Sequence, residues 1–334
     1  TRAAMSDLLG GVDPRGHAIA DATDAALLGA LAIAGREEAE RWGSERAHVT
    51  FVAMGRYGGH ECSYASDADV IALHEPVGGA SDSEAAASAT AIVNRVKKLL
   101  GSATSQLGIV VDLDLRPEGK NGPMSRTIAS HEEYAQRWAS TWERQAAVRA
   151  RPIGSSALDE RARALFESMA YREVSESEVR DIRLLKARME NERLPRGSEP
   201  ARHVKLGPGG LSDVEWTIQL IQMRHGREVE GLRTPSTTRA IAVARDAGLL
   251  AAPDAEILLS AWDLATRIRA GNTLATGRMS GVKLDVLPRD SAELSALAAI
   301  LGYGSGGLTA LEEDWLRAAR QARNVMERAF WEQQ

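Results

Sequence analysis

Apolar and polar residues follow two different periods in the first half of the chain. Two short, β-prone apolar runs, residues 50–54 and 68–73, are separated by a glycine-containing segment, which is typical of two strands of one sheet. A third strand is expected over residues 108–116, where apolar and charged residues alternate. Amphipathic helices are expected over residues 20–42 and 81–101, because apolar residues recur there at helical spacing.

From residue 156 onward the pattern is almost entirely helical. Ser/Thr-x-x-Glu pairs, whose reciprocal hydrogen bonds start helices, predict several of the N-termini. Glycines at the ends of the apolar stripes predict the C-termini. The pairs are Ser81/Glu84, Ser130/Glu133, Ser175/Glu178, Ser212/Glu215 and Thr309/Glu312; the glycines are Gly226, Gly271 and Gly302; the helices span residues 156–171, 175–194, 211–225, 236–250, 254–270, 291–302 and 308–331.

These elements predict an α+β protein in which a small mixed sheet with helices precedes an all-α bundle. We expect a helical lead-in over residues 1–45, a catalytic domain over 46–155 and a helical domain over 156–334. Tyr134, Trp138 and Trp142 recur at intervals of four, so we expect one further helix with these three side chains on the side that faces the core.

Composition narrows the class of protein. With 41 basic and 46 acidic residues the net charge is −5, which argues against a dedicated nucleic-acid binder. A single cysteine, Cys62, allows no internal disulfide and fits a reducing cytosol. The sequence has no run of about 18 apolar residues and has Asp7 and Asp13 near its start, so we expect a cytoplasmic protein without a membrane span or signal peptide. A first residue of Thr1 suggests a piece of a larger polypeptide.

Carboxylates lie on the predicted strands at spacings that suit a metal site. Asp67 and Asp69 occupy positions i and i+2 where the second strand begins, so they share one face. Asp112 shares a face of the third strand with Asp114 and Arg116. Mg²⁺ and Mn²⁺ prefer such oxygen ligands, together with substrate phosphates. An Asp-x-Asp pair alone also occurs at solvated strand ends, and the third strand alone is equally typical of an edge strand.

Two glycine pairs are candidate phosphate sites. Gly58 and Gly59 lie between the first two strands, where backbone N–H groups can approach a phosphate, and Ser66 offers a hydroxyl beside Asp67. The second pair precedes a predicted helix N-terminus, which favours anions. The residues of this second loop are Lys205, Gly209 and Gly210, followed by Asp213 and Glu215 in the helix; an ordinary capped helix is the alternative.

The order strand, Gly-Gly, Asp-x-Asp, strand resembles the nucleotidyltransferase superfamily that includes DNA polymerase β. The wording GRYGGHECSYASDAD resembles the G-x-x-G-G-x-E-x-x-x-x-S-D-x-D signature of the glutamine synthetase adenylyltransferase/adenylyl-removing enzyme family. Two further stretches match in wording, W-E-x-Q-A-x-x-R-A-R and K-x-x-x-G-G-[IL]-x-[DE]-[IV]-E-F. The matching residues are Gly55, Gly58, Gly59, Glu61, Ser66, Asp67 and Asp69; Trp142, Gln145, Arg149 and Arg151; and Lys205, Gly209, Gly210, Leu211, Asp213, Val214 and Glu215, with Trp216 in place of Phe.

The resemblance implies transfer of AMP from ATP to a tyrosine hydroxyl of glutamine synthetase, with release of pyrophosphate and with Mg²⁺ or Mn²⁺ as cofactor. In the family, Asp112 corresponds to the third acidic residue, whereas Asp114 stands where many members have Arg. Gln145 favours the C-terminal, adenylylating half. The implied catalytic and metal residues are Asp67, Asp69 and Asp112; the nucleotide-binding residues are Gly58, Gly59, Ser66, Arg116, Lys205, Gly209 and Gly210; the supporting residues are Glu61, Asp114, Arg149, Arg151, Asp213 and Glu215.

Three other functions stay open at this point. The same carboxylates serve the phosphorolytic removal of AMP from glutamine synthetase, or uridylyl transfer to a small regulatory protein. A binding module that senses nucleotide is the non-enzymatic alternative. A PII-type signalling protein is a further partner, expected to act through a portion outside this chain; no nucleic-acid or membrane partner is expected.

Overall fold

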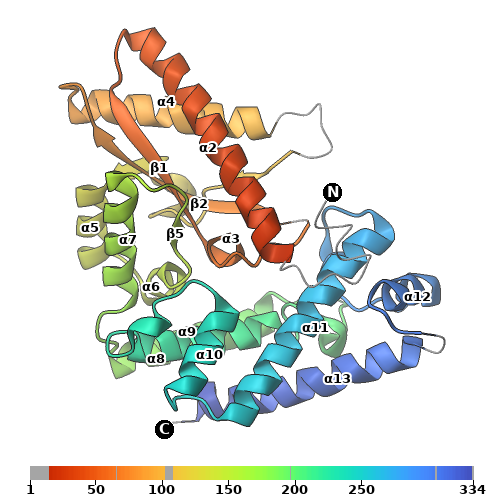
Figure 1. Cartoon of the computed structure of the whole chain (residues 1–334). Coiled ribbons are helices and arrows are strands. Elements are labelled where there is room, and N and C mark those ends of the chain that lie inside the picture. The colour runs from red at the N-terminus through yellow and green to blue at the C-terminus, as the bar shows by residue number, and fades with distance from the viewer. Residues whose placement is uncertain (1–14, 65, 102–107, 196, 305–306, 333–334) are drawn as a thin grey trace. The chain divides into compact units, whose positions relative to one another are not determined.

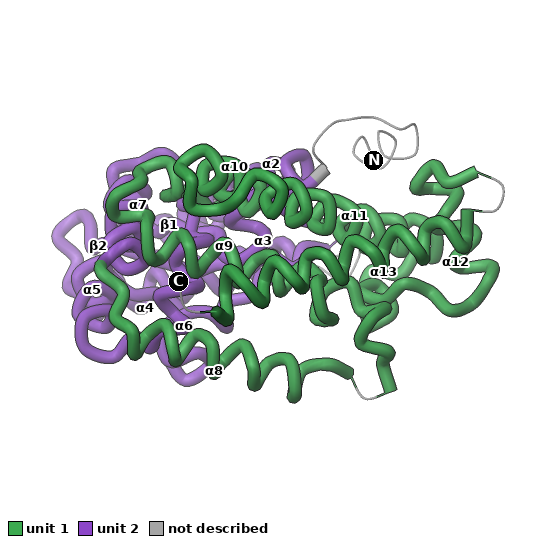
Figure 2. The backbone as a smooth tube through the Cα atoms, turned by 90° about the horizontal axis from the view of Figure 1, so that it is seen from below, with its two compact units in different colours: residues 1–15, 63–65, 173–334 green, residues 16–62, 66–172 purple. Residues whose placement is uncertain are grey.

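The computed structural model describes residues 15–64, 66–101, 108–195, 197–304 and 307–332. Two compact units are present, and Figure 2 colours them separately. The sheet unit comprises Gly16–Cys62 and Ser66–Arg172; the helical unit comprises Glu173–Gln334, with which Ser63 and Tyr64 are grouped. The sheet unit therefore includes residues on both sides of the expected boundaries at 45/46 and 155/156. The first 14 residues of the expected lead-in lie outside the described residues.

A mixed sheet forms the centre of the sheet unit. β1 (Ala47–Ala53) pairs antiparallel with β2 (Ala68–Pro76), in a register that runs from Ala47 opposite Pro76 to Ala53 opposite Val70. The other edge of β1 holds β5 (Arg151–Pro152). On the other edge of β2, β3 (Val111–Asp112) and β4 (Ser125–Thr127) run parallel to it, β3 near its start and β4 further along. The expected strands at residues 50–54 and 68–73 are confirmed.

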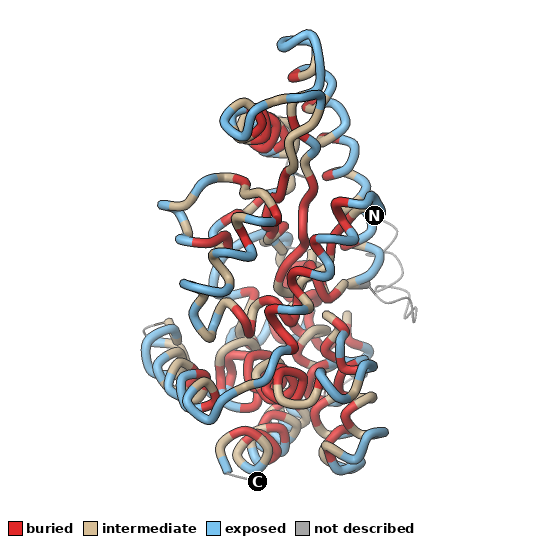
Figure 3. Tube along the Cα trace, turned by 90° about the vertical axis from the view of Figure 1, so that its left-hand side faces the viewer, coloured by how far each residue is buried: buried red, intermediate tan, exposed pale blue. Residues whose placement is uncertain are grey.

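Helices cover both faces of this sheet (Figure 1). α2 (Arg15–Trp42) and α4 (Asp82–Leu100) enclose a core in which Leu27 and Ile92 meet Phe51 and Val70. α5 (Ile128–Arg137) and α7 (Ala157–Ala170) pack on the opposite face, and α6 (Thr141–Ala147) packs on α7. Figure 3 shows buried positions along the strands and exposed ones along the outer sides of the helices.

The third strand is much shorter than the alternation predicts. Instead of residues 108–116, only Val111–Asp112 pairs with β2. The chain turns directly afterwards, because the Asp114 N–H donates to Asp112 Oδ1 (2.7 Å) and the Arg116 N–H donates to the Leu113 carbonyl (3.1 Å). These local bonds compete with the strand ladder. β4 and β5 were not predicted, since two- and three-residue strands carry too little alternation to detect.

The predicted helix with an aromatic stripe is two helices. The Thr127 hydroxyl, rather than that of Ser130, caps α5, and the chain leaves the helix at Trp138. Ser140 and Glu143 then form the capping box of α6. Trp138 is 74% exposed and Trp142 is 41% exposed, so the expectation that the stripe faces the core is wrong for these two residues.

The helical unit confirms the expected bundle. Its helices are α8 (Glu176–Glu192), α9 (Leu211–His225), α10 (Thr237–Asp246), α11 (Ala252–Thr276), α12 (Ser291–Ile300) and α13 (Gly307–Met326), the last followed by a π-helical turn over Glu327–Trp331. Trp315 of α13 is fully buried in a core with Leu211, Ile218 and Leu258. Short 3₁₀ turns lie at Gly119–Asn121, Pro200–Arg202, Glu230–Leu232 and Val282–Asp285.

The caps of these helices correct part of the prediction. The capping boxes at Ser81 and Ser175 and the C-cap at Gly226 are present as expected. Gly210, not Ser212, is the N-cap of α9, and Thr309 lies inside α13. α11 continues through Gly271 and ends at Gly277, which has the left-handed φ of 67° that such an end requires.

Helix α2 is more apolar than the sequence analysis assumed. Over residues 16–42 it is long and apolar enough to meet a simple criterion for a membrane-spanning segment, so the expectation that the chain contains no such stretch is wrong. Ala20, Leu27, Ala30 and Ala34 lie in the core of the sheet unit, which gives this apolar stripe a packing role.

Candidate active site

A short helical turn, α3 (Gly55–Gly58), brings β1 to the carboxylates of β2. Gly55 has a left-handed φ of 54°, and a Cβ atom placed on it would lie 3.3 Å from Asp69 Oδ2. The Met54 N–H donates to the Asp69 carbonyl (2.9 Å), which fixes the approach. Glycine is required at residue 55 for two reasons, the backbone angle and the nearby carboxylate.

Asp69 and Asp112 are brought side by side by the parallel pairing of β2 and β3, in which they are direct register partners. Neighbouring strands lie about 4.8 Å apart. Ala68 and Val70 are buried in the opposite core, so Asp69 projects from the face that α5 and α7 cover further along the sheet. Asp67 precedes β2 and is exposed, with half-buried Ser66 beside it. Within the described ranges, no three His, Cys, Asp or Glu side chains already converge closely enough to hold one metal ion.

The glycine pair Gly58 and Gly59 closes the α3 turn. The Gly58 N–H donates to the Met54 carbonyl (2.8 Å) and the Gly59 N–H donates to the Gly55 carbonyl (3.2 Å). Both donors are used inside the turn, so a phosphate contact by these N–H groups, which stays a prediction, would have to displace these bonds. Gly58 is needed for packing instead, because a Cβ atom there would lie 1.8 Å from the Arg149 carbonyl.

Glu61 and Arg149 hold the start of the turn. Arg149 donates through Nη2 to Glu61 Oε2 (2.5 Å) and through Nε to the Gly55 carbonyl (3.1 Å). The two side chains are only 10% and 4% exposed. A buried guanidinium that binds a carboxylate and a backbone carbonyl fixes geometry more firmly than a surface pair. The supporting role predicted for both residues agrees with these contacts.

Arg151 holds the end of the same turn. Its Nε donates to the Gly58 carbonyl (3.1 Å), while Nη1 and Nη2 donate to both carboxylate oxygens of Asp24 on α2 (2.7 and 3.0 Å). The Tyr57 hydroxyl also donates to Asp24 (2.5 Å). Burial, together with this hydrogen bond, raises the pKa of Tyr57. Asp24 was not among the predicted site residues; an acidic residue within an Ala- and Leu-rich helix was the available signal.

Arg116 and Asp114 do not lie as the alternation predicts. Arg116 is buried and donates to the carbonyls of Leu113 (2.8 Å) and Gly122 (3.3 Å), so its contacts stabilise the loop after β3. Asp114 is half exposed and pairs with Lys120 (3.2 Å). The predicted nucleotide contact of Arg116 is not supported, because these two donors face the backbone of its own loop.

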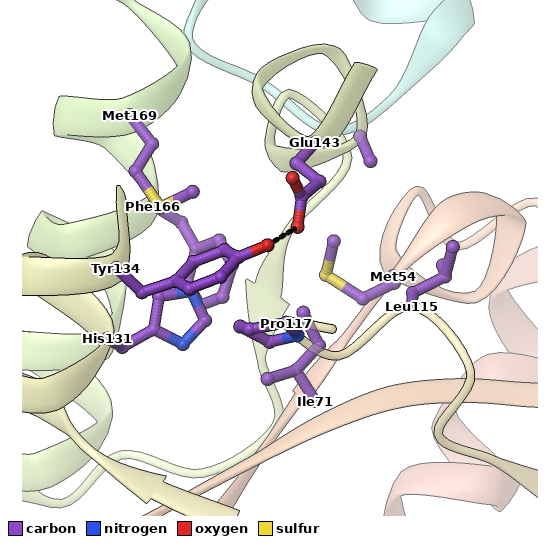
Figure 4. Close-up of a pocket in the computed structure, with 10 residues that line it drawn as sticks. Met54, Ile71, Leu115, Pro117, His131, Tyr134, Glu143, Phe166 and Met169 are labelled. Carbon is purple, nitrogen blue, oxygen red and sulfur yellow. Dashed lines mark hydrogen bonds between the residues drawn. The ribbon is translucent and has the colours of Figure 1, made fainter. Parts of the chain in front are cut away.

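A small recess lies between the sheet and helices α5, α6 and α7, and Figure 4 shows its lining. Its floor includes Met54 and Ile71, two residues beyond Asp69 on β2. The Tyr134 hydroxyl donates to Glu143 (2.8 Å) across it. His131, at 1% exposure, completes the wall, and its Nδ1 has no hydrogen-bond partner among the described residues. The recess is therefore mainly apolar with a few polar atoms.

His131 should make the folded protein sensitive to acid. Burial lowers the pKa of His131 to about 4, against an ordinary value of 6.5. Between these values the unfolded chain binds a proton that the folded chain refuses, so stability is lost as the pH falls from 6.5 to 4, by at most about 1.4 kcal/mol per unit. Urea titrations at several pH values should show a shallower acid slope for His131→Leu. Equal slopes for both proteins would contradict this assignment.

Cys62 is a bystander in the chemistry. It is buried, and burial raises the pKa of its thiol to about 12, so the reactive thiolate is scarce at neutral pH.

The second glycine loop belongs to the helical unit, and its glycines also serve packing. The Gly209 N–H donates to Asp213 Oδ2 (2.7 Å) and the Gly210 N–H donates to the Gly207 carbonyl (2.9 Å). Both N–H groups are hydrogen-bonded locally, and the nucleotide contact predicted for them stays a prediction. Lys205 and Glu215 are both half-buried. Their predicted roles stay predictions.

Asp213 is the centre of a buried ionic cluster. Its carboxylate accepts from Lys186 Nζ (2.6 Å) and from Arg323 Nη1 (3.1 Å), and both cations also contact Glu190. Lys186 and Asp213 are each 1% exposed. Lys186 is therefore a core residue of the helical unit and not part of a solvated face of α8. The cluster joins α8 and α13 to the first turn of α9, where Asp213 also accepts from the Gly209 N–H.

Replacing Gly209 by alanine should destabilise the helical unit. Its φ is 73°, and a Cβ atom would lie 1.8 Å from the Ala319 carbonyl of α13. Overpacking of this kind costs about 1–3 kcal/mol. Gly248→Ala is the matched control, since Gly248 has nearly the same φ of 71° but no atom within 4 Å of the added carbon. Urea denaturation of both variants measures the difference; equal losses would show that only the backbone angle matters.

Comparison with known proteins finds related sequences for both halves of the chain. Residues 2–166 match the family model described as glutamate-ammonia ligase adenylyltransferase, and residues 183–330 match the model described as PII-uridylyltransferase. Proteins named bifunctional glutamine synthetase adenylyltransferase/adenylyl-removing enzyme are similar over nearly the whole chain. The one from Streptomyces coelicolor is 45% identical over 98% of this chain and 32% of its own length. Those from Bifidobacterium longum subsp. infantis and Nocardia farcinica are 44% and 41% identical, over 95% and 98% of this chain and 30% and 33% of their own lengths.

The chain spans about one third of the curated relatives it matches. Its first half carries the family signature at the β1–β2 connection, and its second half matches a helical segment shared with uridylyltransferases. The fold class predicted from the sequence, a nucleotidyltransferase sheet domain followed by a helical bundle, is confirmed. The chain belongs to the family of bifunctional glutamine synthetase adenylyltransferases/adenylyl-removing enzymes.

Proposed function

We propose that this chain transfers AMP from ATP to a tyrosine hydroxyl of glutamine synthetase and releases pyrophosphate. The observation that carries the proposal is the register pairing of Asp69 with Asp112 beside the Gly55 turn. The names of the relatives support the choice of substrate protein. Regulation of nitrogen assimilation is the corresponding cellular role.

The carboxylates Asp67, Asp69 and Asp112 would hold Mg²⁺ or Mn²⁺, because paired carboxylates on adjacent strands are the oxygen donors these ions prefer. When bound, the metal supplies charge neutralisation for the triphosphate and for the leaving pyrophosphate. Asp112 keeps a fixed orientation through the bond from the Asp114 N–H to its Oδ1. We assign to Asp112 acceptance of the phenolic proton, since a phenol with an ordinary pKa of about 10 must lose it during attack.

Further contacts in the sheet unit hold the carboxylates and the neighbouring turn in a fixed geometry. Arg149 and Arg151 fix the turn that touches Asp69, and Ser66 offers a hydroxyl at the start of the same strand. Lys205, in the helical unit, is the proposed cation for the nucleotide. A PII-type signalling protein, acting through a portion outside this chain, is the proposed regulator, and the cytoplasm is the proposed location.

The direction of the reaction is part of the proposal. Gln145, buried in α6, stands at the position that favours the adenylylating half. The relatives' names also include removal of AMP, which is the reverse chemistry at the same kind of site. Uridylyl transfer is the second candidate, favoured by the match of residues 183–330 to the uridylyltransferase model.

One incubation separates these candidates. Purified glutamine synthetase, this chain and Mg²⁺ are mixed with ATP or with UTP, and the intact mass of glutamine synthetase is measured. We expect a gain of one AMP with ATP and no change with UTP. A second mixture starts from adenylylated glutamine synthetase and phosphate. If AMP is removed in it faster than AMP is added in the ATP mixture, the assigned direction is reversed. No mass change in any mixture would reject catalysis by this chain.

A further inference from the structure

We propose that Asp24 of helix α2 is a positioning residue for the transfer reaction, acting through Arg151 on the turn that carries Gly55 to Asp69. The effect on the rate of AMP transfer rests on the proposed function, whereas the effect on the turn does not. Asp24 lies outside the segment with the family signature. Its carboxylate is only 17% exposed and both of its oxygens accept hydrogen bonds from Arg151.

The turn is held at both ends by arginines from one short segment. Arg149 binds the carbonyl of its first residue, Gly55, and Arg151 binds the carbonyl of its last residue, Gly58. The two guanidinium groups are neutralised by different carboxylates, Glu61 for Arg149 and Asp24 for Arg151. Each arginine is therefore committed to a carboxylate and a backbone carbonyl, which is the geometry of support and not that of a phosphate ligand.

Asp24 also fixes the side chain inside the turn. The Tyr57 hydroxyl donates to the same Oδ1 atom that accepts from Arg151, and the Arg151 guanidinium lies 5.5 Å from the centre of the Tyr57 ring. Tyr57 is 1% exposed. Replacing Asp24 by Asn would leave the nearly buried Arg151 guanidinium without its charged partner and with one acceptor oxygen in place of two, which is costly. The turn would then lose its fixed distance from Asp69.

Hydrogen exchange and steady-state kinetics test this together. In Asp24→Asn, we expect faster amide exchange over residues 55–61, with β1 and β2 unchanged, and a kcat lowered roughly 10- to 100-fold with little change in the KM for ATP. Asp24→Glu should recover part of the kcat. Glu40→Gln, at an exposed position of the same helix, is the control and should match the wild type.

A double variant separates support from direct substrate contact. If Asp24 acts through Arg151, the variant Asp24→Asn/Arg151→Lys should be no slower than the slower single variant. Additive losses would show that Asp24 and Arg151 act independently, and a raised KM for ATP in Arg151→Lys alone would show that Arg151 binds nucleotide; either result would overturn the proposal. Unchanged exchange over residues 55–61 in Asp24→Asn would overturn it as well. The exchange measurement does not depend on catalytic activity. If the wild type transfers no AMP, the proposed function is rejected, but hydrogen exchange still tests whether Asp24 fixes the turn.

Discussion

Asp69→Asn should abolish AMP transfer and leave the fold intact. The amide keeps the size of the carboxylate but loses the charge that attracts a divalent cation beside Asp112. Charge stabilisation by a catalytic metal is worth several kcal/mol, so a loss of about 10³-fold in kcat or more is expected. The rate of mass gain by glutamine synthetase at saturating ATP and Mg²⁺ measures it. Asp67→Asn should also abolish transfer.

The control for this prediction is Glu133→Gln, an exposed acidic residue of α5 that pairs with Arg137 one turn away. It removes the same charge from the same unit. We expect full activity from it. Thermal denaturation of Asp69→Asn should match the wild type within the scatter of surface substitutions. An Asp69→Asn protein that keeps the wild-type rate would discard the carboxylate assignment.

Asp112→Asn sharpens the same test. The amide oxygen at residue 112 can still accept the hydrogen bond from the Asp114 N–H, so the turn after β3 is preserved. Any loss of activity then reports the missing charge and not a disordered loop. If the carboxylates of Asp69 and Asp112 bind the same cation, Asp69→Asn and Asp112→Asn should lower the rate of AMP transfer by similar factors.

The strand positions of the carboxylates could be predicted from the sequence. Strand alternation and the Asp-x-Asp spacing depend only on neighbouring residues, so Asp69 and its buried neighbours Ala68 and Val70 could be placed from the pattern. Asp112 was correctly assigned to a strand beside the site even though that strand is only two residues long. Its partner became visible only through the register of β2 and β3, which no local pattern specifies.

The glycines show what a local sequence pattern cannot separate. A Gly-Gly pair near a carboxylate suggests a phosphate cradle, but the same residues are needed wherever two backbones approach closely. The carbonyls of Arg149 and Ala319, which take the space of the missing Cβ atoms of Gly58 and Gly209, are distant in sequence. Asp24 and Lys186 were missed for a related reason: their partners lie 127 and 27 residues away. Long-range ion pairs leave no periodic signal.

Asp213→Asn should be the most destabilising of the substitutions considered for the helical unit. The amide still accepts from the Gly209 N–H, but Lys186 and Arg323 lose a charged partner where Lys186 is 1% exposed. Breaking a buried pair by removing one charge costs about 3–5 kcal/mol, because the remaining charge is buried without full compensation. Urea denaturation, with hydrogen exchange over residues 176–225 to identify the unit that opens, measures the loss.

Removing the orphaned cation should recover part of that stability. In the variant Asp213→Asn/Lys186→Met, the apolar side chain fits the buried position without a charge, so the double variant should lose less than the sum of the two single variants. The exposed pair of Arg289 with Glu199 supplies the contrast, since Glu199→Gln should cost no more than about 1 kcal/mol. If Asp213→Asn cost as little as Glu199→Gln, the cluster would not hold α8 and α13 to the first turn of α9.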